Sequence, residues 1–362
     1  MLIYYIIIVL VCFIMAFSID DRLWYGRLVW LPLFIIFLVL VAGLRYGIGT
    51  DYESYIEIYQ RVPPPLDIGF SDIQFVEPGF LLLCIIAKSI FGSFVFVSIA
   101  TSLIIFINLF FASKRFNINP LLSIPVYVSL FYLSHQFNII RHGIAMSFVW
   151  LAISYIDEKR FLRFLLFILL GSLFHKIALL VFPLYFILGK RLKFYWVIGA
   201  VLLCFIIGIY TNVFNNPILN VLFADSRKYQ YYINDYYKNI NGQASFGISF
   251  GTVFNIVIVL IIYHSWFLRI KTKNIMLANA LFFGVCAVGL LNKNGVFVER
   301  ISGIFYLSIM FIIPQFFLKN RRQWLILICV MFYCLFYYWK TLHSKEADGR
   351  FQYIPYQTVL SK

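Results

Sequence analysis

The sequence predicts an all-α polytopic membrane protein with about twelve transmembrane helices and one further short helix, re-entrant or interfacial. Of its 362 residues, 62% are apolar and only 12% are charged, against about 25% charged in a soluble globular domain. Long apolar runs recur from residue 2 to residue 339, as in chains that cross a bilayer repeatedly. This composition excludes a typical soluble enzyme, a disordered chain and a nucleic-acid-binding domain. We expect residues 1–362 to form a single integral membrane domain.

The apolar runs give the predicted spans in chain order. They are 2–18, 28–44, 94–112, 120–134, 143–156, 161–173, 177–189, 194–212, 248–268, 275–291, 301–318 and 323–339. Several are shorter than the roughly 20 residues that a spanning helix needs, so some spans are expected to be broken. The run 79–91 is shorter still and contains Lys88, which is typical of a re-entrant or interfacial helix.

The distribution of basic residues predicts the orientation. The first apolar run has no basic residues before it and is followed by Arg22 and Arg27, which indicates an uncleaved span with its N-terminus outside. The inside loops are then 19–27, 113–119, 157–163, 190–193, 269–274 and 319–322, and they hold 16 of the 30 basic residues. The large segments, loops 45–93 and 213–247 and the tail 340–362, are predicted to lie outside, so any chemistry is expected on the outer face.

Charges at the ends of spans are costly and usually functional, and five groups of them lie at predicted outer ends. The first is residues 43–52, GLRYGIGTDY, at the end of the second span. Its three glycines permit a tight backbone fold, so Arg45 and Asp51 could pair or share one ligand. The alternative is a helix exit with a snorkelling arginine.

The second and third groups each combine a charge with a predicted helix start. Glu77 precedes Pro78, which fits a functional carboxylate and ordinary helix-start chemistry about equally. Arg141 and His142 begin an apolar helix. A cation there opposes the helix dipole, so Arg141 is expected to have an anionic partner; the alternative is an interfacial snorkelling pair.

The fourth and fifth groups are short. His175 is a candidate general base or hydrogen-bond donor, and Lys176 is a candidate phosphate contact; taken alone, Phe174-His175-Lys176 fits a polar turn. Glu299 and Arg300 begin the eleventh span and could simply neutralise each other.

Together these groups place Arg45, Arg141, Lys176 and Arg300 on one predicted face. Arginine suits bidentate phosphate recognition, so the cluster fits a lipid-linked phosphate or pyrophosphate. Asp51 and Glu77 are candidate bases for a hydroxyl.

The outside loop 225–246 interleaves aromatic residues with amides. Tyr231, Tyr232, Tyr236 and Tyr237 are candidate stacking platforms for sugar rings; the alternative is an interfacial aromatic belt. The sequence lacks a Walker A motif, an Asp-x-Asp metal motif and a Gly-x-Ser-x-Gly elbow, so we expect neither a metal nor another cofactor.

Four strings resemble the EpsG family of Wzy-like bacterial polysaccharide polymerases: GLRYGIGTDY (43–52), EPGF (77–80), IRHGIA (140–145) and FHK (174–176). They occur in order over residues 1 to 318, with one departure, His142 where the family pattern has glutamine. The resemblance implies a glycosyltransferase-C-like helical fold in the bacterial inner membrane. It implies a growing glycan on undecaprenyl pyrophosphate as donor, a repeat unit on the same carrier as acceptor, and no metal. A chain-length regulator is a candidate partner.

The two lines of inference combine into one mechanism. Arg141 and Arg300 are expected to hold the donor pyrophosphate, and Arg45 the pyrophosphate of the second carrier. Glu77 is the first choice of base and Asp51 the second, with His175 as a further candidate. The alternatives are an O-antigen ligase with the same donor, a membrane O-acyltransferase, and a non-enzymatic lipid-linked-glycan flippase or exporter.

Overall fold

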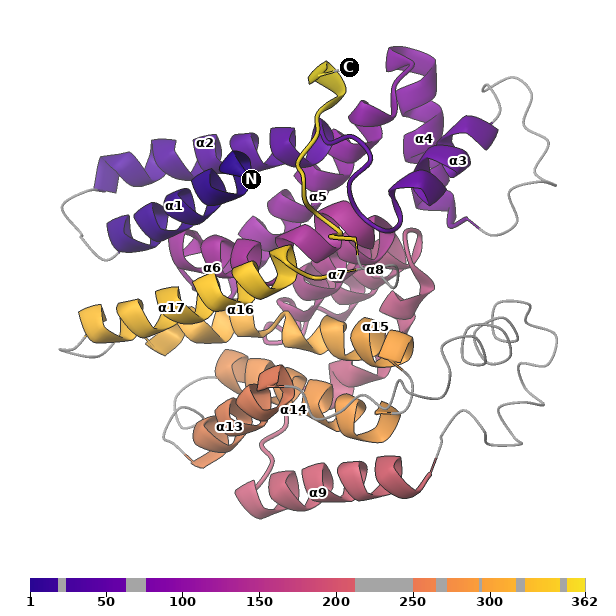
Figure 1. Cartoon of the computed structure of the whole chain (residues 1–362). Helices are drawn as coiled ribbons and strands as arrows, with labels where there is room; N and C mark the ends of the chain where they lie inside the picture. Colours follow the sequence, from indigo (N-terminus) through magenta and orange to yellow (C-terminus); the bar gives the residue numbers. More distant parts are fainter. Residues whose placement is uncertain are drawn as a thin grey trace. The chain divides into compact units, whose positions relative to one another are not determined.

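The computed structural model describes residues 1–18, 24–62, 76–211, 250–264, 272–292, 295–316, 323–345 and 350–361. These residues are mostly helical, and they contain no strand beyond two isolated β-bridges. The chain forms two compact units (Figure 1). One comprises Met1–Tyr185 with Met310–Lys362, and the other comprises Phe186–Ile309.

The first unit contains most of the helices. They are α1 (Leu2–Phe17), α2 (Trp24–Gly43), α3 (Tyr52–Arg61), α4 (Pro78–Phe91), α5 (Phe94–Arg115), α6 (Pro120–Tyr127), α7 (Ile140–Ile153), α8 (Phe161–Ser172) and α17 (Gln323–Leu342). A 3₁₀ helix, Lys176–Phe186, takes the place of the span predicted at 177–189. The span predicted at 120–134 continues past α6 as two π-helical turns, Val128–Tyr132 and Ser134–Asn138.

By length and composition, four described segments could cross a membrane: Phe94–Arg115, Lys273–Leu291, Val298–Gln315 and Leu325–Leu342. The other apolar helices are shorter, at 10–17 residues. The described residues therefore form an all-α membrane protein, as the sequence predicts. The number of twelve spans stays a prediction.

Helices α5 and α7 run parallel, held by buried polar contacts along their length. Ser102 hydrogen-bonds to Gln136, just before α7. Asn108 Nδ2 donates to Ser147 Oγ at 3.0 Å, and Arg115 Nε donates to Ser154 Oγ at 3.0 Å. The last two pairs share a sequence offset of 39 residues, so the two helices have one register and their N-termini lie at the same end.

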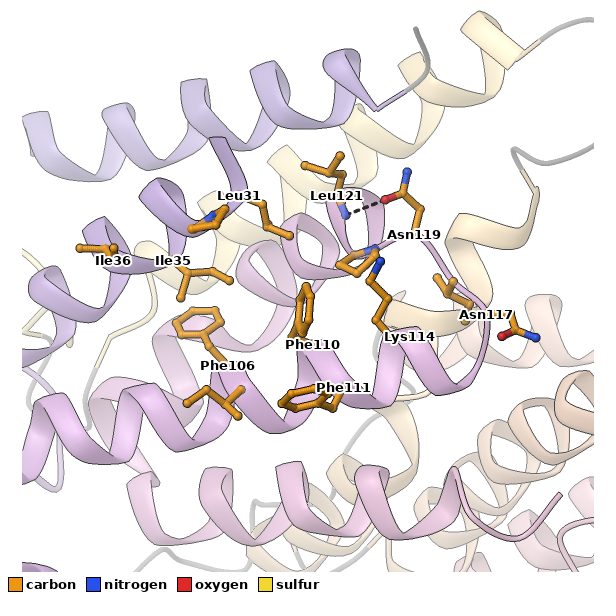
Figure 2. A pocket seen from close by; sticks show the side chains of 14 residues that line it. Leu31, Ile35, Ile36, Phe106, Phe110, Phe111, Lys114, Asn117, Asn119 and Leu121 are labelled. Atoms are coloured by element: carbon orange, nitrogen blue, oxygen red, sulfur yellow. Dashed lines mark hydrogen bonds between the residues drawn. The ribbon is translucent and has the colours of Figure 1, made fainter. Parts of the chain in front are cut away.

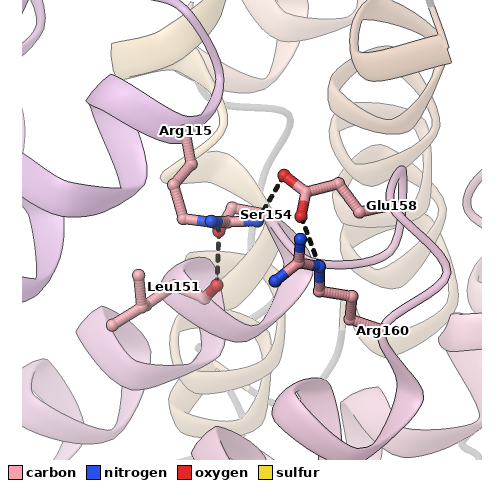
Figure 3. Close-up of polar contacts among 5 residues, drawn as sticks. All are labelled: Arg115, Leu151, Ser154, Glu158 and Arg160. Carbon is pink, nitrogen blue, oxygen red and sulfur yellow. Dashed lines mark hydrogen bonds and ion pairs between the residues drawn. The ribbon is translucent and has the colours of Figure 1, made fainter.

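A charged cluster ties the C-terminal ends of these helices together (Figure 3). Arg115 Nη2 lies 2.7 Å from Glu158 Oε1, and Arg160 Nε lies 2.8 Å from Glu158 Oε2. The Arg115 guanidinium also stacks over the ring of Tyr155, at 3.5 Å from its centroid. Both basic side chains thus share one carboxylate, which commits the charge of Arg115 to this cluster.

Helix α4 is held by both of its ends. Glu77 at its N-terminus pairs with Arg141 at the start of α7. Near its C-terminus, Lys88 Nζ donates to the carbonyls of Gln60 at 3.0 Å and Val62 at 2.5 Å, at the end of α3. The placement of α4 in or on the membrane stays a prediction.

The second unit contains α9 (Phe194–Tyr210), α13 (Phe250–His264), α14 (Thr272–Leu291) and α15 (Gly295–Tyr306). The backbones of α9 and α14 touch where Gly208 meets Gly289, because a Cβ on Gly208 would overlap the Gly289 carbonyl oxygen. Small residues commonly allow such close packing of membrane helices. The amide of Asn279 donates to the carbonyls of Leu188 at 2.6 Å and Lys190 at 2.8 Å, which anchors α14 to the chain before α9.

Candidate active site

An ion pair between Glu77 and Arg141 is the centre of the candidate site. Arg141 Nη1 lies 2.5 Å from Glu77 Oε2. The Glu77 side chain is 8% exposed and the Arg141 side chain 24%, so the carboxylate is enclosed while the arginine side chain is partly exposed. Arg141 stands in the first turn of α7, where a cation is unfavourable without an anion beside it. Glu77 supplies that anion in this structure.

Backbone contacts bring the third motif beside this pair. The Gly79 N–H donates to the Leu173 carbonyl at 2.8 Å, which joins the start of α4 to the end of α8. Leu173 is followed by Phe174, His175 and Lys176. The motifs EPGF, IRHGIA and FHK therefore meet in one place.

Tyr55 lies against the guanidinium from the side of α3. The Arg141 guanidinium carbon lies 5.8 Å from the centroid of the Tyr55 ring, and the phenol and the guanidinium interact electrostatically. Burial raises the pKa of Tyr55, while Arg141 opposes this to a smaller extent and the carboxylate of Asp51 adds to it. The phenol of Tyr55 therefore remains protonated near neutral pH, and it interacts electrostatically with both Arg141 and Asp51.

Three histidines form a row beside the ion pair. The ring centroids of His142 and His175 are 5.5 Å apart, and those of His135 and His142 are 5.9 Å apart. His135 and His142 are buried, whereas His175 is half-buried. His175 Nδ1 accepts a hydrogen bond from the Ile177 N–H at 3.3 Å, so a neutral His175 carries its proton on Nε2. In that tautomer His175 is a hydrogen-bond donor.

The glycine-rich segment 43–52 packs onto the same region through Asn138. The Thr50 N–H donates to Asn138 Oδ1 at 3.1 Å. Gly49 has a φ of +103°, and a Cβ there would overlap the Phe137 carbonyl oxygen. Only glycine fits this backbone conformation and this close approach.

The C-terminal tail, residues 350–361, lies along this segment (Figure 1). The Tyr46 N–H donates to the Gln357 carbonyl and the Val359 N–H to the Leu44 carbonyl, each at 2.9 Å. Asn138 Nδ2 donates to the Tyr353 hydroxyl at 2.7 Å. The tail and the segment 43–52 therefore lie side by side; their position outside the membrane stays a prediction.

Arg45 is enclosed by these contacts. Its side chain is 2% exposed, and its Nη1 donates to the Ala42 carbonyl at 2.5 Å, at the C-terminal end of α2. The guanidinium carbon lies 5.0 Å from the Phe137 ring centroid, and Nε and Nη2 have no hydrogen-bond partner. Burial lowers the pKa of Arg45 to about 10, so the side chain is still charged at neutral pH.

A comparison with models of protein families identifies the family of this chain. The model of the EpsG family matches residues 28–358. The chain belongs to the EpsG family. This is a family of Wzy-like polysaccharide polymerases, so the chain is a membrane protein of the polysaccharide-polymerase type. No curated protein and no solved structure matches it.

In this EpsG-family protein, four of the five predicted groups come together in the first unit. Glu77 and Arg141 form the ion pair, and His175 lies beside His142, the residue after Arg141. Asp51, half-buried at the start of α3, interacts electrostatically with Tyr55, as Arg141 does. Lys176 is exposed and follows His175 directly.

The remaining predicted residues lie elsewhere. The expectation that Arg45 could pair with Asp51 is wrong, because Arg45 turns back to the Ala42 carbonyl and lies between aromatic rings. Arg300 lies half-buried on α15 in the second unit, beside Glu299. The glycan-binding candidates Tyr231, Tyr232, Tyr236 and Tyr237 lie outside the described residues.

Three contributors to this site escaped the sequence analysis. Tyr55 belongs to α3, whose buried tyrosines recur at positions 52, 55 and 59; this helical spacing was a usable signal. Asn138 and the tail residue Tyr353 meet only in the fold, and no sequence pattern links them. Among the described residues, no group of three or more His, Cys, Asp or Glu side chains is arranged to hold a metal ion; metal independence stays a prediction.

Proposed function

We propose that this protein joins oligosaccharide repeat units carried on undecaprenyl pyrophosphate and releases undecaprenyl pyrophosphate. The product would be O-antigen, capsule or exopolysaccharide, made on the outer face of the bacterial inner membrane. The observation that carries the proposal is the partly exposed Arg141 at the start of α7, which is paired with Glu77 and is followed by His142, the neighbour of His175. Family membership supports the polymerase class.

Arg141 is the residue that we assign to the donor pyrophosphate. A guanidinium can bind two phosphate oxygens at once, and charge develops on the pyrophosphate as the glycosidic bond breaks. A fixed cation at that position stabilises the transition state more than the ground state. The Glu77 carboxylate and the Tyr55 hydroxyl position the guanidinium, so little reorganisation is needed when the substrate binds.

His175 and Lys176 are the second contribution to phosphate binding. In the tautomer set by the Ile177 N–H, His175 offers a donor at Nε2. Lys176 is exposed at the start of the following helix and adds a mobile positive charge. Together, His175 and Lys176 can bind the pyrophosphate oxygens that Arg141 does not contact.

Asp51 is our choice of general base, ahead of Glu77. Glu77 is buried and its oxygen is held by Arg141, whereas Asp51 is half-buried at the start of α3, where Thr50 Oγ1 donates to its Oδ1 at 3.4 Å. A base must reach the acceptor hydroxyl directly or through one water, and the more exposed carboxylate suits that role. We propose that Glu77 acts on the reaction by positioning Arg141.

Arg45 has a different part in this proposal. It is enclosed, so contact with the second carrier would require the tail 350–361 to move away. We therefore assign Arg45 mainly to holding the glycine-rich segment through α2 and Phe137. Arg300 as a further pyrophosphate contact, the glycan surface of loop 225–246 and a chain-length regulator as partner remain proposals from the sequence.

The first experiment is the surface-glycan profile of a strain that lacks the gene, resolved as a gel ladder. A polymerase predicts collapse of the ladder to a single repeat. Loss of all surface attachment, with polymer accumulating on the lipid carrier, would instead indicate a ligase. An unchanged ladder would refute both enzymes and return attention to a flippase, an exporter or an acyltransferase.

A further inference from the structure

A groove of about 910 Å³ runs between α2, α5 and the start of α6 (Figure 2). None of the residues that line it is assigned above to the reaction. Its walls are apolar: Ile35 and Ile36 of α2 face Phe106, Ile107 and Phe110 of α5. Its volume lies near the top of the range of about 300–1,000 Å³ typical of small-molecule sites. Between Phe106 and Lys114 the axis of α5 rises about 12 Å, so the groove suits an extended chain.

One end of this groove is polar. Lys114, Asn117 and Asn119 gather there, opposite the end where Ile35, Ile36 and Phe106 lie (Figure 2). Asn119 accepts the Leu121 N–H through Oδ1 at 3.1 Å, so its Nδ2 is still a donor. Asn117 and Lys114 are exposed. This end therefore presents a cation and amide donors next to an apolar slot.

Among the described residues that line this end of the groove, one carries a charge, Lys114. Arg115, the neighbouring basic residue, is committed to Glu158 and Tyr155. Lys114 makes a cation–π contact at 5.8 Å with Phe110 and no ion pair with any carboxylate of the described residues. The α5 helix ends at Arg115 and is long and apolar enough to cross a membrane, so Lys114 lies at the end of a candidate span.

We propose that this groove binds one anionic phospholipid, with an acyl chain along α5 and the phosphodiester at Lys114 and Asn119. A phosphodiester carries one negative charge, which matches the one cation among the described residues that line the groove. A pyrophosphate carries more charge, and the described lining residues include no second cation for it. The occupant is thus a structural or regulatory lipid of the surrounding bilayer.

The groove lies at the end of the α5–α7 pair opposite the catalytic residues. Arg141 stands at the N-terminus of α7, whereas Arg115 contacts Ser154 just after its C-terminus. Helix α7 has 14 residues, so these ends are about 20 Å apart along the axis. The parallel course of α5 places Lys114 at the far end, and a lipid headgroup there lies near the other membrane face.

The experiment is native mass spectrometry of the purified full-length protein in mild detergent, with phosphatidylglycerol and phosphatidylcholine of identical acyl chains as probes. Wild type is expected to bind phosphatidylglycerol about fivefold more tightly, the effect of one lysine near an anionic headgroup, about 1 kcal/mol. Lys114→Gln should abolish the preference, and Lys114→Arg should keep it. Lys193→Gln is the matched control, because its Nζ lies 5.7 Å from the Tyr195 ring in a similar exposed cation–π contact.

The acyl-chain slot is tested on the same helix. Ile107→Trp should weaken binding of both lipids by fivefold or more, because Ile107 lines the groove. Leu103→Trp, one turn earlier and also exposed, should leave binding unchanged. Unchanged phosphatidylglycerol binding in Lys114→Gln and Ile107→Trp would overturn the proposal. Displacement of phosphatidylglycerol by an equal amount of undecaprenyl phosphate would also overturn it, since the groove would then be a carrier site.

Discussion

The geometry of the Glu77–Arg141 ion pair allows a quantitative prediction of how much the pair contributes to the free energy of unfolding. Replacing either residue by glutamine removes one charge and leaves the other in a mostly buried position. Breaking a buried pair in this way costs about 3–5 kcal/mol. Because Arg141 is 24% exposed, water recovers part of this cost, and we expect each single variant to lose about 2–3 kcal/mol of unfolding free energy.

The double variant Glu77→Gln/Arg141→Gln separates coupling from the individual losses. Two unit charges about 4 Å apart interact by about 4 kcal/mol at an effective dielectric constant of about 20, and the desolvation of both groups offsets part of that. We therefore expect a coupling free energy of about 2 kcal/mol, so the double variant should lose about 2–4 kcal/mol, where independent losses would add to about 4–6 kcal/mol. The matched control is Glu57–Arg61, 3.6 Å apart with side chains 65% and 78% exposed, which should couple by about 0.3–0.5 kcal/mol.

The assay is reversible unfolding of the purified protein in detergent micelles, followed by intrinsic fluorescence for wild type, both single variants and the double variant. The four free energies give the coupling directly. Losses at Glu77 and Arg141 that add within about 0.5 kcal/mol would refute the reasoning, because they would mean that the two side chains do not interact in the folded protein.

The remaining predictions use pairs of similar residues. Tyr55→Phe should lower the rate of polymerisation by about tenfold, because the Tyr55 hydroxyl helps to position the Arg141 guanidinium (about 1.4 kcal/mol). The control is Tyr59→Phe, whose hydroxyl has no hydrogen-bond partner and which should keep wild-type activity. Equal activities of the two variants would contradict this role of Tyr55. Gly49→Ala should prevent accumulation of folded protein in membranes, because the added Cβ would overlap the backbone at Phe137. Gly47→Ala is the control: a Cβ there meets open space, so the variant should lose only about 1–2 kcal/mol of unfolding free energy for its positive φ. A folded Gly49→Ala variant would show that the segment 43–52 packs differently. Glu158→Gln should lower the unfolding free energy by no more than about 1 kcal/mol, although Glu158 pairs with two arginines. The Glu158 side chain is 35% exposed, and exposed ion pairs contribute little to stability. A loss above about 2 kcal/mol would show that the cluster of Arg115, Glu158 and Arg160 is shielded from water.

The sequence alone predicts the helical membrane class and identifies the motifs that the fold brings together. Apolar runs predict helices because each span must satisfy its own backbone hydrogen bonds. Arg141 stood out because its position at a helix start opposes the dipole, and the structure places Glu77 beside it. Both inferences rest on local rules, which a single sequence exposes.

Long-range contacts could not be predicted in the same way. The role of Asn138 depends on bonds to Thr50 and Tyr353, which are 88 and 215 residues away. Arg45 resembled a substrate contact in sequence, and only the tail and Phe137 reveal that it is enclosed. The short helix α3 lies in the predicted loop 45–93, and its only helical signal in the sequence is the spacing of its buried tyrosines at 52, 55 and 59.

The central claim is that Arg141 carries polymerisation. The most direct test is the surface-glycan ladder of a gene-deletion strain complemented with Arg141→Gln, at membrane levels of protein equal to wild type. We predict a ladder reduced to a single repeat, as in the deletion strain, while the exposed control Arg61→Gln restores the full ladder. A wild-type ladder with Arg141→Gln would contradict the account.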